Sequence, residues 1–493
     1  MAGNAIVIGG GLGGLSAAIY LAHAGVRVRL LEKNADLGGK CNYRHWQGYH
    51  FDTGPSLLTM PFVVDELFKA VGKRREDYLD FMRVSPACRY FFPDGTMFDA
   101  PGTLEGFREN IAAAFPEDLD GYDRFIDYGK KLWEVSGPLF LFNRLEPSLI
   151  TKIRPQHAWA GLAAMRPWTM RKAIEHYFKA PQLRQLFSRY ATYNGSDPWR
   201  TPATFNVISY VEMAFGSWHI QGGIYQLVRA LTQLAEELGV EFSTGVAVDC
   251  IEFSKDGRSV TGVRMPDAKK IEADTVVVNA DGVGALTGPL MAEHPSSDEW
   301  QSKWKAKEAA SSGFVQLMAV AGEHDALACH NIFFNQNYED EFTDLFHDPK
   351  PLRDPTIYIS APCKIDSSQA PDGNEAWFVL LNAPSTDRVP DWPADYGGRI
   401  IQRLSRRLPS FDPSKILWSS ELPPTFLRDQ YAAWNGSIYG PSSNTQTAAF
   451  LRLPNGGSVK GLYFAGGSSH PGGGIPLVLT SGRLAAELAC KRR

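Results

Sequence analysis

Two glycine-rich segments near opposite ends of the 493-residue chain constrain its fold more than any other feature. The first, residues 9–14, reads Gly-Gly-Gly-Leu-Gly-Gly and follows the apolar run of residues 5–9. The second, residues 465–476, is too long and too rich in glycine for an ordinary turn, and it follows the strand-like residues 461–465. Short apolar runs of this kind are typical of buried parallel strands. If both segments serve one ligand, that ligand is long, and the intervening chain is inserted into its binding domain.

The N-terminal segment has the context of a dinucleotide-binding fingerprint. A strand is expected over residues 5–9, a helix over 15–24 and a second strand over 26–32. In the pattern Gly9-x-Gly11-x-x-Gly14, the first glycine allows a tight turn, the second a close approach of the pyrophosphate, and the third close packing of helix and strand. The helix N-terminus supplies donors to the phosphates. Glu32, at the end of the second strand, is expected to accept the ribose hydroxyls.

A second passage of helix and strand belongs to the same sheet. We expect a helix over residues 224–238, a strand from 240, a hairpin formed by 246–253 and 260–265, and a buried strand over 274–281. The predicted fold is therefore α/β, a Rossmann-type dinucleotide-binding domain with inserted substrate domains. Its segments are the cofactor-binding residues 1–70, 225–290 and 455–493, a mostly helical insertion over 71–224 that faces substrate and membrane, and an α+β substrate domain over 291–454.

The choice of FAD over NAD depends on glycines outside the fingerprint. Gly38 and Gly39 follow Glu32 closely and permit a second close approach of the backbone, as an extended FAD molecule needs. The segment 465–476 permits a third close approach of the backbone to the cofactor. Together they indicate FAD rather than a nicotinamide cofactor.

These motifs resemble the amine oxidase-like flavoproteins, and within them the phytoene desaturase family of carotenoid oxidoreductases, over essentially the whole chain. The matching stretches are residues 38–40, 51–55, 222–225 and 462–476. The resemblance implies an FAD-dependent oxidoreductase with an amine oxidase-like architecture. It places the pyrophosphate near the backbone of Gly466 and Gly467, the isoalloxazine by residues 473–476, and the adenine near the backbone of Val248. The cofactor-binding residues expected from fingerprint and resemblance together are Gly9, Gly11, Gly13, Gly14, Glu32, Lys33, Gly38, Gly39, Lys40, Val248, Asp281, Gly466, Gly467, Gly474, Ile475 and Pro476.

The chemistry implied by this resemblance is the removal of hydride from an allylic carbon of a polyene, which is work for an oxidised flavin. It agrees with the lack of a Ser-His-Asp or paired-carboxylate motif in the sequence. His470, inside the second glycine segment, is the candidate proton acceptor. The alternative is that its ring holds the loop by hydrogen bonds. Asp52 and Glu212 are expected to be structural.

The sequence is compatible with two reactions of this family. Residues 210–216 and 470–481 resemble desaturases of an acyclic polyene such as phytoene or diapophytoene, which is the reading we favour. Other stretches resemble the oxidases of terminal carotenoid methyl groups, and these are residues 38–42, 54–61, 354–358 and 435–440. A flavin oxidase of amines and a non-enzymatic prenyl-lipid-binding protein of the same fold are further alternatives.

Composition and local charge bear on partners and location. The formal net charge of −4 gives no argument for nucleic acid. Scattered cysteines without paired spacing indicate reduced thiols and no metal. We expect a cytoplasmic protein in peripheral contact with a membrane through residues 136–172, where an apolar run precedes interleaved basic residues and tryptophans; a helical lid with a solvated charged face is the alternative. The expected acceptor of the electrons is O2 or a quinone.

Overall fold

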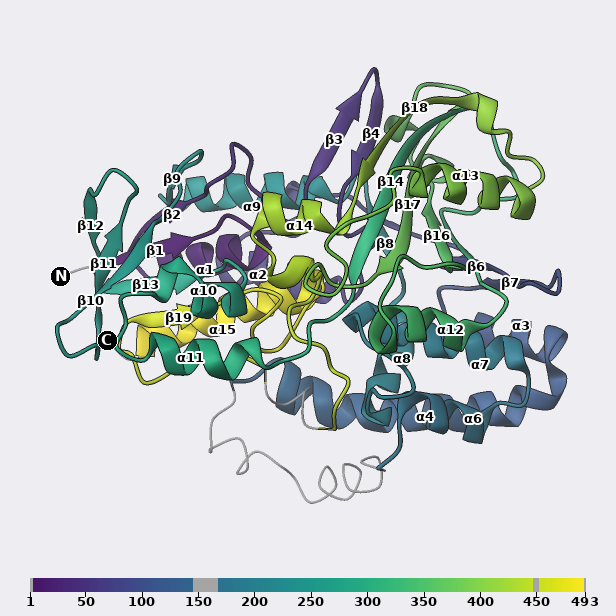
Figure 1. Cartoon of the computed structure of the whole chain (residues 1–493), viewed down its shortest axis with the longest axis horizontal. Helices are drawn as coiled ribbons and strands as arrows, with labels where there is room; N and C mark the ends of the chain where they lie inside the picture. Colours follow the sequence, from purple (N-terminus) through teal and green to yellow (C-terminus); the bar gives the residue numbers. More distant parts are fainter. Residues whose placement is uncertain (1–2, 145–166, 447–451, 492–493) are drawn as a thin grey trace.

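The computed structural model describes residues 3–144, 167–446 and 452–491. Its first sheet has five parallel strands in the order β19-β13-β1-β2-β9. The strands are β1 (Asn4–Ile8), β2 (Arg27–Leu31), β9 (Glu241–Ser243), β13 (Thr275–Val278) and β19 (Leu462–Phe464). The N-terminal and C-terminal parts of the chain therefore meet in one sheet (Figure 1).

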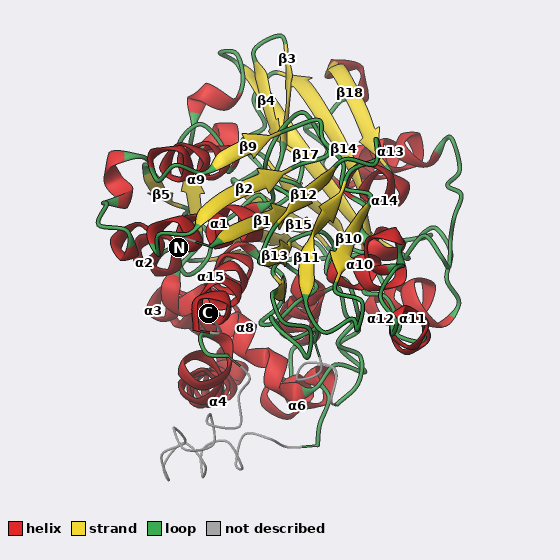
Figure 2. Cartoon of the chain, turned by 90° about the vertical axis from the view of Figure 1, so that its left-hand side faces the viewer, coloured by secondary structure: helices red, strands yellow, loops and turns green. Residues whose placement is uncertain are grey.

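Both faces of this sheet are buried, which explains the nearly continuous apolar runs. Because successive side chains point to opposite faces, Val7 packs into one core and its neighbour Ile6 into another. Helices α1 (Leu12–His23), α9 (Tyr225–Glu237) and α15 (Ile475–Lys491) share the core of Val7. Helix α10 (Gly282–Thr287) and the antiparallel sheet of β10 (Cys250–Phe253), β11 (Val260–Arg264) and β12 (Lys270–Glu272) lie with the other core (Figure 2).

A second sheet has seven strands in the order β18-β14-β17-β16-β15-β6-β7. They are β6 (Cys88–Phe91), β7 (Met97–Ala100), β14 (Ser312–Ala321), β15 (His330–Phe333), β16 (Ile357–Ser360), β17 (Asn374–Ala383) and β18 (Ile416–Leu422). Helix α13 (Tyr396–Arg407) packs its buried residues into the core of this sheet. Neighbouring strands are antiparallel except for β15 and β6.

Helices cluster below this sheet in Figure 1. They are α3 (Leu104–Ala114), α4 (Leu119–Val135), α6 (Met170–Tyr177), α7 (Pro181–Ser188), α8 (Val207–Phe215) and the 3-10 helix η5 (Arg189–Asn194). The remaining longer helices are α2 (Phe62–Ala70), α11 (Ser297–Lys305), α12 (Tyr338–Phe342) and α14 (Pro424–Tyr431). Two antiparallel pairs complete the strands: the hairpin of β3 (Tyr43–Trp46) with β4 (Tyr49–Asp52), and the pair of β5 (Phe81–Arg83) with β8 (Trp218–Ile220), which lie far apart in the sequence. Within the described ranges, none of the helices has the length and apolar character needed to cross a membrane.

The observed elements differ from the predicted ones at two places. Residues 246–249 are not part of a strand, and the hairpin begins only at Cys250. Residues 246–248 instead line the cavity described below. Strands β6 and β7 belong to the predicted helical insertion and pair with each other, and β6 also pairs with β15 of the other insertion. The seven-stranded sheet therefore contains strands from both predicted insertions. The five-stranded sheet draws only on the three segments predicted for it, while the domain boundaries remain predictions.

Candidate active site

One cavity of about 1020 Å³ connects the two sheets. Its glycine-lined part is bounded by residues 9, 11–13, 31–34, 38–41, 246–248, 466–468 and 471–476. Its sheet-lined part is bounded by strands β14 to β18, helix α8 and the segment 55–60. The structure brings the predicted cofactor-binding residues together here: all of them except Gly14 line the cavity.

The fingerprint turn is held by close contacts of backbone with backbone. Gly9 has a φ of +98°, in the left-handed region that favours glycine. A Cβ at Gly14 would lie 2.1 Å from the carbonyl oxygen of Gly9, so Gly14 serves packing beneath the turn rather than the cavity wall. Asn279, after β13, donates from Nδ2 to the same oxygen at 3.1 Å. Helix α1 has Gly11 as its N-cap without a side-chain cap, which leaves its first amides available to an anion.

Glu32 is buried and held by two backbone amides. Its Oε2 accepts from Gly10 N at 2.7 Å and its Oε1 accepts from Asn34 N at 2.9 Å. Each carboxylate oxygen has a further lone pair, which suits the acceptance of ribose hydroxyls. Lys33 lies beside it with its Nζ directed to the carbonyl oxygen of Asp429, and the backbone of Val248 forms another part of the wall.

The C-terminal segment meets the fingerprint at the bottom of the cavity. A Cβ at Gly13 would lie 3.0 Å from Gly466 N, and Gly466 has a φ of +105°. The amide of Gly466 donates to Ser481 Oγ at 3.1 Å, which ties the segment to helix α15. That helix begins at Ile475, so its N-terminus also opens into the cavity next to Gly474.

Lys40 and Asp281 are predicted site residues that also bind the surrounding chain. The Nζ of Lys40 donates to the carbonyl oxygens of Ser437 and Ile438 at 2.9 and 2.8 Å. Burial lowers the pKa of Lys40, and the nearby Asp281 carboxylate opposes this shift. Asp281 accepts from the amides of Val283 and Gly284 and caps helix α10. Both side chains therefore fix the loops that form the cavity wall.

This set of groups fits FAD. Two helix N-termini, a buried carboxylate and several side-chain-free approaches lie along one elongated cavity, as a dinucleotide with two phosphates and two ribose-like chains requires. Bound FAD supplies a flavin that accepts hydride from a substrate carbon. The residues of this chain orient the cofactor, exclude water and hold a substrate against it.

His470 lies outside the cavity wall. It is buried, its amide donates to Leu453 O at 2.8 Å, and its Nε2 lies 2.9 Å from Asn143 O. The ring meets Phe140 edge-on, and burial lowers the pKa of His470. These contacts match the loop-holding alternative, while the role as proton acceptor remains a prediction.

Arg452 and Asn194 join the site without having been predicted. Arg452 is buried, and its Nη1 donates to the carbonyl oxygens of Tyr439 and Gly467, both at 3.1 Å. Its Nη2 donates to Asn194 Oδ1 at 2.7 Å. Burial lowers the pKa of Arg452 to about 10, so it is a cation at neutral pH. Neither residue lies in a glycine motif, and only the fold brings them together.

The sheet-lined part contains a buried ion pair between Arg189 and Glu212. Arg189 Nη2 lies 3.4 Å from Glu212 Oε1, which also accepts from the hydroxyl of Tyr190 at 2.7 Å. Tyr193 donates to the other carboxylate oxygen, and Arg189 Nε donates to Tyr90 at 2.8 Å. Glu212 is thus well satisfied, in agreement with the structural role expected for it.

Asp52 caps a helix from the neighbouring hairpin. Its carboxylate accepts from Ile224 N at 2.8 Å and from Tyr225 N at 3.1 Å, at the start of α9. Burial raises the pKa of Asp52 to about 6, against the effect of these two hydrogen bonds. The side chain is structural, as expected.

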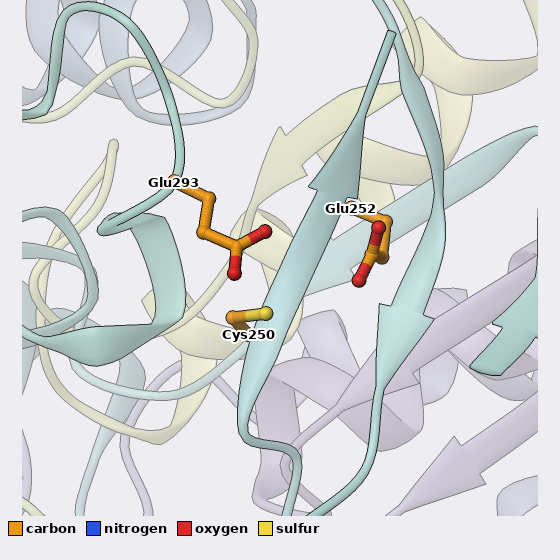
Figure 3. A group of neighbouring side chains, drawn as sticks. All are labelled: Cys250, Glu252 and Glu293. Atoms are coloured by element: carbon orange, nitrogen blue, oxygen red, sulfur yellow. The ribbon is translucent and has the colours of Figure 1, made fainter. Parts of the chain in front are cut away.

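Cys250, Glu252 and Glu293 lie close together outside the cavity (Figure 3). Arg264 forms ion pairs with both glutamates, and Lys270 forms another with Glu252. Burial raises the pKa of Cys250 to about 11, so its thiol is protonated at neutral pH. Both carboxylates of the group are thus already paired with cations of this chain.

The segment predicted to contact a membrane is described only at its ends. Residues 145–166, with Lys152, Arg154, Trp159 and Arg166, lie outside the described residues. Leu139, Phe140 and Leu141 line the cavity, so this part of the apolar run faces the site.

The comparisons with known proteins agree with this geometry. Residues 12–490 match the family described as flavin containing amine oxidoreductase. The chain is 34% identical to a 1-hydroxycarotenoid 3,4-desaturase of Flavobacterium sp. (strain P99-3), over 98% of each chain. It is also 34% identical to a 4,4'-diapolycopene oxygenase of Methylomonas sp., over 98% of this chain and 97% of the relative. An oxidoreductase from Methanosarcina mazei shares the fold, with a TM-score of 0.66, 15% identity and coverage of 98% and 100%.

The predicted resemblance, fold class and cofactor are thereby confirmed. The fold is the Rossmann-type arrangement with an amine oxidase-like architecture, and the cofactor is FAD. The chain belongs to the family of flavin containing amine oxidoreductases and is an FAD-dependent oxidoreductase.

Proposed function

We propose that the protein is a carotenoid oxidoreductase that removes hydride from an acyclic polyene and so introduces conjugated double bonds. The similarity to carotenoid enzymes along the full chain carries this proposal. The apolar side chains of the sheet-lined part support it, because a polyene offers little but dispersion and hydrophobic contact. They include Val211, Val315, Phe378, Leu380 and Leu422.

Oxidation of a terminal methyl group is the second candidate. It is favoured by the similarity to the Methylomonas relative, which is a 4,4'-diapolycopene oxygenase. Both reactions begin at an activated carbon next to a polyene, so one cavity suits either. The two differ in product, because desaturation lengthens the conjugated system, whereas terminal oxidation adds an aldehyde or carboxylate.

Co-expression separates the candidates. The gene is expressed in bacteria that make phytoene, diapophytoene or an already conjugated carotenoid, and the pigments are analysed by absorption and mass. A red-shifted product that has lost hydrogen supports desaturation, whereas an oxygen-containing product supports terminal oxidation. The absence of any new product in all three backgrounds contradicts both.

We further propose that the protein works in peripheral contact with a membrane and passes its electrons to O2 or to a quinone. A substrate dissolved in lipid motivates the first point. Flotation of the purified holoenzyme with anionic and neutral vesicles tests it. To test the second, the flavin is reduced anaerobically, and its reoxidation is then measured separately after mixing with O2 and, without oxygen, after mixing with a soluble quinone.

A further inference from the structure

Three hydrogen-bonding side chains form a chain on the wall of the sheet-lined part. The hydroxyl of Tyr358 lies 2.6 Å from Ser56 Oγ and 2.8 Å from His330 Nδ1. His330 and Tyr358 come from the neighbouring antiparallel strands β15 and β16, and Ser56 comes from the segment that precedes α2. All three residues line the cavity.

This series of hydrogen-bonded side chains ends at Ser56, whose hydroxyl can form one more hydrogen bond. His330 is buried, whereas Ser56 and Tyr358 are only partly covered. Within the part of the chain that the structure describes, Ser56 Oγ forms its hydrogen bond with Tyr358 and no second one. The surrounding wall is apolar, with Val315, Phe378 and Leu380 nearby on the same sheet. A polar group in such surroundings is stabilised when a partner occupies its remaining position.

The donor and acceptor roles in these hydrogen bonds can reverse, because the His330 ring is neutral and has two tautomers. Burial lowers the pKa of His330 to about 3, and the charges of His219 and Arg189 act in the same direction. With the proton on Nδ1, His330 donates to Tyr358, Tyr358 donates to Ser56, and the Ser56 hydroxyl donates into the cavity. With the proton on Nε2, each of these bonds reverses, and Ser56 accepts from the cavity. The chain therefore suits either a carbonyl or a hydroxyl group.

The nearby charges favour a neutral ligand. Arg189 is already paired with Glu212, whose carboxylate also accepts from Tyr190 and Tyr193. A carboxylate ligand would gain no free cation from this pair and would lose its hydration. A hydroxyl or aldehyde oxygen carries no such cost.

We propose that Ser56, Tyr358 and His330 form a subsite that binds a hydroxyl or carbonyl oxygen at one end of the polyene. Oxygenated linear carotenoids are then preferred over the corresponding hydrocarbons. This inference rests on the proposed function and specifies its substrate class. A site that hydrogen-bonds an oxygen discriminates against a ligand lacking it, because its own polar group is left unpaired.

The test compares neurosporene with 1-hydroxyneurosporene. The rate of flavin reduction is measured for the purified holoenzyme under anaerobic conditions, and dissociation constants are measured by quenching of tryptophan fluorescence. We expect wild type to prefer the hydroxylated compound by about 10-fold in kcat/KM, a value that corresponds to one good hydrogen bond. Tyr358→Phe and Ser56→Ala each lower this preference by about 3- to 10-fold. Both substitutions are small enough to leave the fold intact.

Tyr431→Phe is the matched control, because it removes a hydroxyl from another cavity-lining tyrosine outside the chain. Its discrimination between the two compounds is expected to equal that of wild type. Equal use of both compounds by wild type overturns the subsite and leaves the proposed function standing. A preference that survives in Tyr358→Phe and Ser56→Ala also overturns it. Failure to bind or oxidise either compound, or any other carotenoid in the co-expression test, overturns the proposed function and the subsite with it.

Discussion

The two parts of the cavity are built from different chemical groups. The glycine-lined part consists largely of backbone, and its tightest contacts are those of Gly13 with Gly466 and of Gly14 with Gly9. The sheet-lined part consists of side chains, among them the buried pair of Arg189 and Glu212. A backbone surface accepts one ligand shape, because no rotamer can adjust it. A surface of side chains can change its specificity by substitution while the fold remains.

The largest expected effect comes from a methyl group in the backbone-built part. In Gly14→Ala the new Cβ would lie 2.1 Å from the carbonyl oxygen of Gly9, so the turn that faces the phosphates must move. Overpacking of this kind costs about 1–3 kcal/mol or more. We expect at least a 10-fold loss of FAD affinity, measured as the ratio of flavin absorbance to protein after gel filtration.

Gly398→Ala is the control for this substitution, since Gly398 lies on α13 with open space at its Cβ position. It should retain FAD as wild type does. Stoichiometric FAD in purified Gly14→Ala would show that the glycine-lined part tolerates adjustment, and the contrast between the two parts would be lost.

A smaller effect on the retention of FAD is expected at Arg452, which contacts both parts of the cavity. Arg452→Met removes donors from the carbonyl oxygens of Tyr439 and Gly467 and from Asn194 Oδ1. Buried acceptors without donors cost about 1–3 kcal/mol each, reduced where the neighbours relax. We expect turnover to fall roughly 10- to 100-fold with partial retention of FAD, whereas Arg452→Lys recovers part of the loss. Unchanged steady-state kinetics and Tm in Arg452→Met would contradict a linking role.

The same contrast explains what the sequence could predict. Glycines at fixed spacing after an apolar strand have a local cause, so residues 9–14, Glu32 and the pair Gly38-Gly39 were readable without a structure. Arg452 and Asn194 lie far apart in the chain and meet through the fold, and no spacing announces them. The same holds for His330 and Tyr358, which become neighbours through antiparallel pairing. The pairing of β6 with β15 could not be predicted from the sequence either, because the two strands belong to different insertions.

The pH dependence of stability provides a more modest test at Asp52. Its pKa is raised to about 6 in the folded protein, from an ordinary value near 3.8, mainly by burial. Between about pH 4 and 6 the Asp52 carboxyl is protonated to a greater extent in the folded than in the unfolded state. Its contribution to the free energy of unfolding therefore falls as the pH rises through this range and is constant at higher pH. His219 and Asp366 face the group and act on its pKa in opposite directions.

Asp52→Asn removes this dependence. The contribution amounts to about 1–3 kcal/mol at 1.4 kcal/mol per pKa unit. We therefore expect the Tm of wild type to fall relative to that of Asp52→Asn by about 1–3 °C between pH 4 and 7. A constant difference in Tm over this range would show that the Asp52 carboxyl has an ordinary pKa.

The smallest effect is expected at His470, although it lies within the segment that faces the cavity. A general base removed from a reaction typically costs 10²- to 10⁴-fold in rate. His470 is instead enclosed by the carbonyl oxygen of Asn143 and the ring of Phe140, and it is absent from the cavity wall. His470→Asn should therefore lower turnover by less than about 10-fold, with the pH profile of kcat unchanged and a modest fall in Tm. A loss of 10²-fold or more, together with the disappearance of an ionisation from the pH profile, would establish His470 as the proton acceptor. In that case a side chain of the glycine-lined part would take part in the reaction, and the two parts of the cavity could no longer be distinguished as backbone and side chain.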